Sequence, residues 1–69
     1  MDWRATVGRN VRRLRQAKGL TQEQLAFEAK LDLTYVGGIE RGRRNPSLEV
    51  LVRLAGALDV APAALLSAT

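Results

Sequence analysis

Cysteine and histidine are absent from this 69-residue chain, and only three of its residues are aromatic. Without cysteine there are no disulfides, thiolate nucleophiles or thiolate zinc ligands, and without histidine the commonest general base and metal ligand are missing. No apolar run approaches the roughly 18 residues of a membrane span, and the first residues lack the apolar stretch of a secretory signal. We therefore expect one cytoplasmic domain over residues 1–69, with no catalytic activity, metal or other cofactor.

Basic residues are in excess, with eleven lysines and arginines against seven acidic residues and a net charge of +4. Only Lys18 and Lys30 are lysine, so arginine dominates. Arginine presents a planar fork of donors that fits phosphates and guanine edges. This charge balance favours a polyanionic partner, but the arginines could also simply form a solvated surface. Their positions in the chain have to distinguish these two interpretations.

Apolar residues recur with a helical period, and short breaks divide the chain into five expected helices. Gly19 ends the first of them. The second starts at a capping box, because the Thr21 hydroxyl can accept from the backbone of Gln24, whose side chain can reach back. This second helix stops near Lys30. The apolar stripe of the first helix consists of Trp3, Val7, Val11 and Leu14.

Three further helices are expected downstream. Asp32 caps one over residues 33–41, Ser47 caps the next, and Pro62 fits the first position of a short helix over residues 63–67. No segment alternates with period two for long enough to form a strand, so the fold class is all-α. The fourth helix has a predicted core stripe of Leu48, Leu51, Val52, Ala55 and Leu58, and a second apolar row of Val50, Leu54 and Ala57.

The second and third helices are separated by a turn of about three residues. Two short helices joined so tightly are typical of a helix-turn-helix unit, in which the second helix enters the major groove of DNA. The turn needs a left-handed residue, and Lys30 stands where glycine is usual, so we expect some backbone strain there.

Four blocks of the sequence resemble the XRE/Cro-type repressor family: GLTQEQLA at 19–26, TYV at 34–36, IERG at 39–42 and NPSL at 45–48. Within that family, residues 31–41 are most similar to the small controller proteins of restriction–modification systems, and the resemblance covers roughly residues 5 to 66. It implies a compact five-helix, lambda-repressor-like domain that binds a palindromic double-stranded DNA operator as a homodimer and regulates transcription.

Further partners follow from the same resemblance. RNA polymerase is a candidate partner and the nucleoid the expected location, while neither a membrane nor a small-molecule effector is expected. The alternative is a protein–protein interaction module, such as an antitoxin or adaptor domain, on which the basic face is incidental.

Candidate DNA-contacting residues lie on the expected recognition helix and the loop after it. One more, Gln22, lies at the start of the second helix, where free backbone amides attract a phosphate. Val36 and Ile39 point inward by their spacing, which leaves positions 33, 34, 37 and 38 outward. Two consecutive glycines each weaken the helix by about 1 kcal/mol relative to alanine, which indicates a close backbone approach to DNA or to a neighbouring helix. The candidates are Gln22, Leu33, Thr34, Tyr35, Gly37, Gly38, Arg41, Arg43, Arg44 and Asn45.

These candidates are expected to act in different ways. Thr34 can bond a base edge, whereas Leu33 offers only apolar contact where the controller proteins often carry arginine. The loop arginines suit phosphates or a narrowed minor groove. With so few side chains available to read bases, we expect DNA shape to supply much of the specificity.

Two structural roles complete the predictions. The family resemblance implies that Glu40 pairs with Arg15 and holds the recognition helix on the scaffold. The second apolar row of the fourth helix and the C-terminal leucines predict a symmetric dimer interface, although these residues could instead complete the core of the monomer. The predicted interface consists of Val50, Leu54, Leu65 and Leu66.

Overall fold

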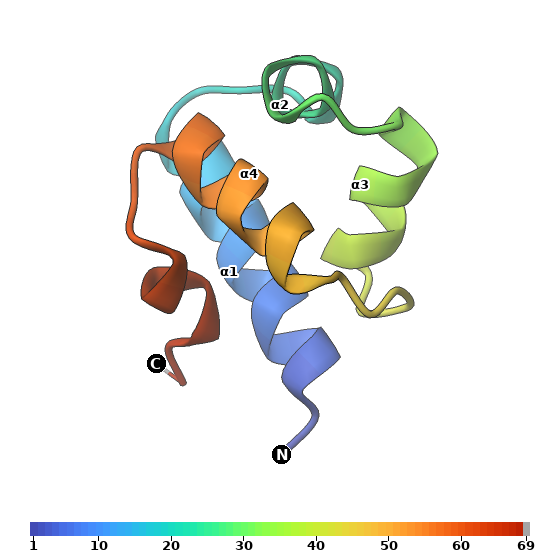
Figure 1. The fold of residues 1–69 in the computed structure, drawn as a ribbon, viewed down its shortest axis with the longest axis vertical. Helices are drawn as coiled ribbons and strands as arrows, with labels where there is room; N and C mark the ends of the chain where they lie inside the picture. Colours follow the sequence, from blue (N-terminus) through green and yellow to red (C-terminus); the bar gives the residue numbers. More distant parts are fainter. Residues whose placement is uncertain (69) are drawn as a thin grey trace.

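The computed structural model describes residues 1–68 and has four α-helices followed by one 3₁₀-helix. The helices are α1 (Trp3–Ala17), α2 (Gln22–Ala29), α3 (Leu33–Glu40), α4 (Leu48–Leu58) and η1 (Pro62–Leu66), and none of the described residues forms a strand (Figure 1). The all-α prediction is confirmed. No helix in residues 1–68 is long and apolar enough to cross a membrane.

The prediction of a fifth α-helix is wrong, because the C-terminal segment is a 3₁₀-helix of five residues. Pro62 starts it as expected, but no side chain caps it. Its end is held from outside, since the buried Asn10 side chain donates to the carbonyls of Leu65 and Ser67 at 2.9 and 2.8 Å. These bonds tie the short segment to α1.

The predicted helix starts are confirmed. Thr21 and Gln24 form the capping box, and the side chains of Asp32 and Ser47 accept from Thr34 and Val50 at the starts of α3 and α4. An additional N-cap, Asp2, starts α1. Each N-cap satisfies backbone donors that the helix itself leaves free.

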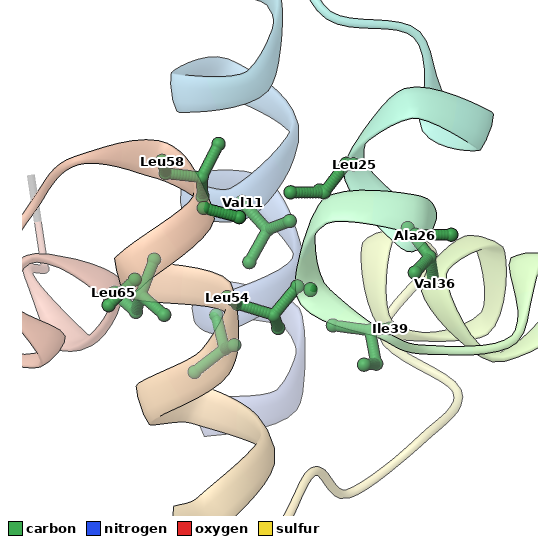
Figure 2. Close-up of a cluster of buried hydrophobic side chains, with 12 residues drawn as sticks. Val11, Leu25, Ala26, Val36, Ile39, Leu54, Leu58 and Leu65 are labelled. Carbon is green, nitrogen blue, oxygen red and sulfur yellow. The ribbon is translucent and has the colours of Figure 1, made fainter.

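Side chains from all five helices meet in one core (Figure 2). Its fully buried residues include Val11 of α1, Leu25 of α2, Ile39 of α3 and Leu54 of α4. α3 and η1 lie on opposite sides of the central pair formed by α1 and α4 (Figure 1). The expected recognition helix is therefore held by α1 and α2 on one side of the molecule.

The predicted core stripe of α4 is partly wrong. Ala55 and Leu58 are buried as expected, but Leu48 is 75% exposed and Val52 is also exposed, whereas Leu54 is fully buried. The reason is that α2 and η1 both pack against α4, and their positions select its buried face. In the stripe predicted for α1, Val7 and Val11 are buried, Leu14 is half-buried, and Trp3 is exposed.

Candidate nucleic-acid interface

The turn between α2 and α3 has the predicted left-handed residue. Lys30 has φ 58° and ψ 46°, and the next backbone N–H, that of Leu31, donates to the carbonyl of Ala26 at 2.8 Å. This pair of features is a Schellman ending, which redirects the chain sharply after α2. Asp32 then starts α3 two residues later, so the turn sets the angle between the two helices.

A buried ion pair attaches the end of α3 to α1. Arg15 donates to Glu40 through Nε at 2.6 Å and through Nη2 at 3.0 Å, which confirms the predicted pair. Gln22 Nε2 also donates to Glu40 Oε1 at 2.9 Å, and Arg15 Nη1 donates to the carbonyl of Leu20 at 2.8 Å. One carboxylate thus joins three helices. Its hydrogen bond raises the pKa of the Arg15 guanidinium, against the effect of burial.

Gln22 therefore holds α3 directly through its side chain. It is half-buried at the start of α2, where free backbone amides favour an anion. Its predicted contact with a DNA phosphate remains a prediction.

The first turn of α3 is open to solvent. Leu33 and Thr34 are exposed and Tyr35 is half-buried, while Val36 and Ile39 are buried, as their spacing predicts. Leu33 and Thr34 are thus available to a groove of DNA.

Gly37 and Gly38, in contrast, are buried, so the expectation that these two positions face outward is wrong. The residues that cover them are arginines of the same segment. A Cβ on Gly37 would lie 3.1 Å from Nη1 of Arg41, and a Cβ on Gly38 would lie 2.7 Å from Cγ of Arg44. The sequence indicated a close approach at the glycine pair, but it did not show that two arginines make it.

The loop after α3, residues 41–45, is called the arginine loop below. It carries three exposed arginines, at positions 41, 43 and 44. No salt bridge within residues 1–68 involves any of them. The guanidinium carbon of Arg44 lies 5.4 Å from the centroid of the Tyr35 ring, within cation–π range. Uncompensated positive charge therefore borders the exposed turn of α3.

Gly8 is a positioning residue that the sequence analysis missed. A Cβ there would lie 2.3 Å from the carbonyl oxygen of Ile39 and 2.8 Å from that of Glu40, so α1 meets the end of α3 backbone to backbone. The only sequence signal was a glycine in the middle of a helix, where it is unfavourable. This contact sets how far α3 stands from the scaffold.

The predicted dimer residues do not form one exposed surface. Leu54 and Leu65 are fully buried in the core, Val50 is half-buried against it, and Leu66 is 45% exposed. The prediction is wrong for Leu54 and Leu65, because α1, α4 and η1 already enclose them.

An exposed apolar surface does exist beside Leu66. Trp3, Leu51 and Leu66 line a pocket of about 110 Å³, together with Asn45 of the arginine loop. Leu48 and Val52 lie one helical turn apart on α4, on either side of Leu51 in sequence, and both are exposed.

Two short helices joined by a tight turn, with an open first turn on the second helix and an arginine loop behind it, define a helix-turn-helix protein. A family model described as helix-turn-helix matches residues 11–65, and the chain belongs to this family.

Named relatives agree with this assignment. The chain is 45% identical over 69 residues to the HTH-type transcriptional regulator y4dJ of Sinorhizobium fredii, covering all of this chain and 90% of that protein. It is 45% identical over 67 residues to the control protein C.BamHI of Bacillus amyloliquefaciens, covering 96% of this chain and 83% of that one.

A solved structure is similar as well. The restriction–modification controller protein C.AhdI of Aeromonas hydrophila superposes with a TM-score of 0.88 at 53% identity, covering 90% of this chain and 94% of that one.

Proposed function

We propose that this protein is a transcriptional regulator that binds a palindromic DNA operator as a homodimer. The observation that carries the proposal is the single surface formed by the exposed first turn of α3 and three arginines that no acidic side chain within residues 1–68 neutralises. Such a surface presents base-reading side chains and phosphate-binding cations together.

The division of roles follows from the side chains. Thr34 is exposed near the start of α3, the part of a recognition helix that reaches base edges. The side chain of Arg43 is exposed in the loop and forms no salt bridge among the described residues, so it is suited to a phosphate. Thr34 should therefore contribute to specificity and Arg43 to affinity for any duplex.

A homodimer is proposed because one small domain covers little DNA, and helix-turn-helix dimers place two recognition helices about 34 Å apart on one side of the duplex. Exposed apolar side chains of α1, α4 and η1 supply the contact, with Leu66 retained from the sequence prediction and the buried leucines replaced by Trp3, Leu48 and Val52. A second copy of the chain would cover apolar groups now open to water.

The closer proposal is a controller protein of a restriction–modification system. The similarity to C.AhdI and C.BamHI over nearly the whole chain supports it. Genes for a methyltransferase and an endonuclease adjacent to this gene would agree with that role, and their absence would contradict it.

Selection from random duplexes at modest ionic strength tests the main proposal. We expect enrichment of an inverted repeat whose halves are about one helical turn apart. Failure to enrich any sequence would refute sequence-specific binding, and enrichment of an isolated half-site would refute the dimer. Affinity with little dependence on salt would favour the interaction-module alternative, because phosphate contacts release counterions.

Two variants separate base recognition from sequence-independent phosphate contact. Arg43→Ala should weaken binding to all sequences alike and reduce the slope of log affinity against log salt by about one for each bound protomer. Thr34→Ala should relax the preference at one base pair in each half-site. Arg53→Ala is the matched control, since it removes one exposed arginine from α4 beside α2. Identical behaviour of Arg43→Ala and Thr34→Ala would contradict the assigned roles.

A further inference from the structure

The glycine pair of α3 is covered in an unusual way. Both residues are buried, yet the nearest atoms that a Cβ would meet at each of them belong to an arginine side chain. Glycine weakens a helix interior, so two consecutive glycines in a helix of eight residues need a reason. Packing against the apolar core does not supply one.

Arg44 lies directly across the backbone of Gly38. A Cβ on Gly38 would be 2.7 Å from Cγ of Arg44, 3.5 Å from its Nε and 3.6 Å from its Cδ. At the far end of the same side chain, the guanidinium carbon lies 5.4 Å from the ring centroid of Tyr35. The arginine is thus held along its aliphatic stem by one residue and at its charged end by another.

The loop geometry brings Arg44 to this position. Gly42 has φ +74°, and the N–H of Arg43 donates to the carbonyl of Gly38 at 2.9 Å, while the N–H of Gly42 donates to that of Ile39 at 3.0 Å. This Schellman ending folds the chain back along α3. Any β-carbon at position 38 would push the arginine stem outward and move the guanidinium away from the ring.

We propose that Gly38 is a positioning residue for Arg44: its missing side chain forms a seat that, with the Tyr35 ring, orients the guanidinium before DNA is bound. The inference rests on the proposed function, because an oriented cation beside α3 matters if a phosphate or base edge meets it. A free arginine loses much rotamer freedom when it binds, and a seat removes that freedom in advance.

An added Cβ at Gly37 would make a less close contact than one at Gly38. The three atoms nearest to the Cβ at Gly37 would all belong to the guanidinium of Arg41, with Nη1 at 3.1 Å, and the end of a flexible side chain can move aside. The seat therefore belongs to Gly38, where the contact is with the stem.

The seat can be tested without DNA by proton NMR of the free protein. In the wild type, the side-chain protons of Arg44 should be shifted upfield by the Tyr35 ring, and Tyr35→Leu should abolish this shift. Gly38→Ala should abolish it as well. Gly56→Ala is the control, since it makes the same change in a helix where a Cβ meets nothing within 4 Å. Retention of the shift in Gly38→Ala would overturn the seat.

Binding to a labelled duplex of mixed sequence tests what the seat does. Loss of one phosphate contact at roughly 0.1 M salt weakens binding about eightfold, from the counterion slope of 0.9 per contact. We expect that loss for each bound protomer with Arg44→Ala, and a loss of about threefold to eightfold for each bound protomer with Gly38→Ala. In the Arg44→Ala background, Gly38→Ala should have no further effect, because the side chain that it displaces is gone.

The double variant also controls for folding, since it removes the atoms that the new methyl group would strike. A further loss in that background equal to the loss in the wild type would mean that Gly38 acts independently of Arg44, and would overturn the proposal. If the wild type itself does not bind the duplex, the proposed function fails instead, and the NMR result still decides whether the seat exists.

Discussion

Arg15→Ala should bring this small domain close to unfolding. The side chains of Glu40 and Arg15 are only 3% and 12% exposed, and the substitution removes both bonds from the guanidinium to the carboxylate. It also leaves the carbonyl of Leu20 without that donor, while Glu40 keeps only the amide of Gln22. A buried charge that loses its partner costs about 3–5 kcal/mol.

That loss is large against the whole stability of the domain. A chain of 69 residues is stable by roughly 3–10 kcal/mol at the usual value per residue. Urea unfolding followed by circular dichroism should therefore show Arg15→Ala partly unfolded, or with a much lower midpoint at an unchanged slope.

Arg53→Ala provides the comparison within the same molecule. Arg53 donates to Glu49 at 2.8 Å, but the side chains are 43% and 74% exposed, so its loss should cost about 0.3–0.5 kcal/mol. The reasoning is refuted if Arg15→Ala costs less than about 0.5 kcal/mol, because burial would then not decide the strength of the pair.

The sign of the pH dependence follows from the pKa of Arg15, which Glu40 raises. A group whose pKa is higher in the folded protein stabilises it at every pH below the unfolded value, and the stabilisation is lost only as the pH rises through the folded value. For a guanidinium that range lies above ordinary buffers. The cost of Arg15→Ala should thus be the same between about pH 7 and pH 9.

Three further changes test the packing by urea unfolding. Gly8→Ala should cost about 3 kcal/mol, since a carbonyl oxygen stands 2.3 Å from the new Cβ, whereas Gly56→Ala, in open space, should gain about 0.5–1 kcal/mol. Lys30→Gly should gain about 0.5–1 kcal/mol by relieving the left-handed backbone at φ 58°, and any loss would contradict the strain expected there. Leu65→Ala should lower the free energy of unfolding by about 3 kcal/mol because the side chain is fully buried. Leu66→Ala should leave the unfolding of the monomer nearly unchanged, but it should shift the mass measured by light scattering from that of a dimer, twice 7.6 kDa, toward that of the monomer. Equal effects of the two substitutions would contradict the revised interface.

Local chemistry made the helix boundaries and the turn predictable. The caps at Thr21, Asp32 and Ser47 act on backbone groups two or three residues away, and Lys30 follows from the turn that joins two short helices. The pairing of Arg15 with Glu40 joins residues far apart in sequence, and it was accessible only through the family resemblance.

The buried face of α4 was predicted wrongly, although polar residues mark its exposed side. Glu49 and Arg53 lie one turn apart on that side and Leu48 and Val52 flank them, whereas Leu54, Ala55 and Leu58 lie on the other side of the helix. Leu54 and Leu48 are chemically identical, yet one is fully buried and the other is 75% exposed. The dimer prediction failed at Leu54 because its row was placed outside the core stripe.

Taken by itself, the order of residues determined an all-helical chain with a helix-turn-helix and an arginine loop, because capping, helical period and turn chemistry act over a few neighbouring residues. The tertiary structure alone decided that Leu65 and not Leu66 is enclosed, how closely Gly8 approaches α3, and that Arg44 covers Gly38. These features depend on distances between segments that are not adjacent in any one helix, and such distances are settled only when the helices pack together.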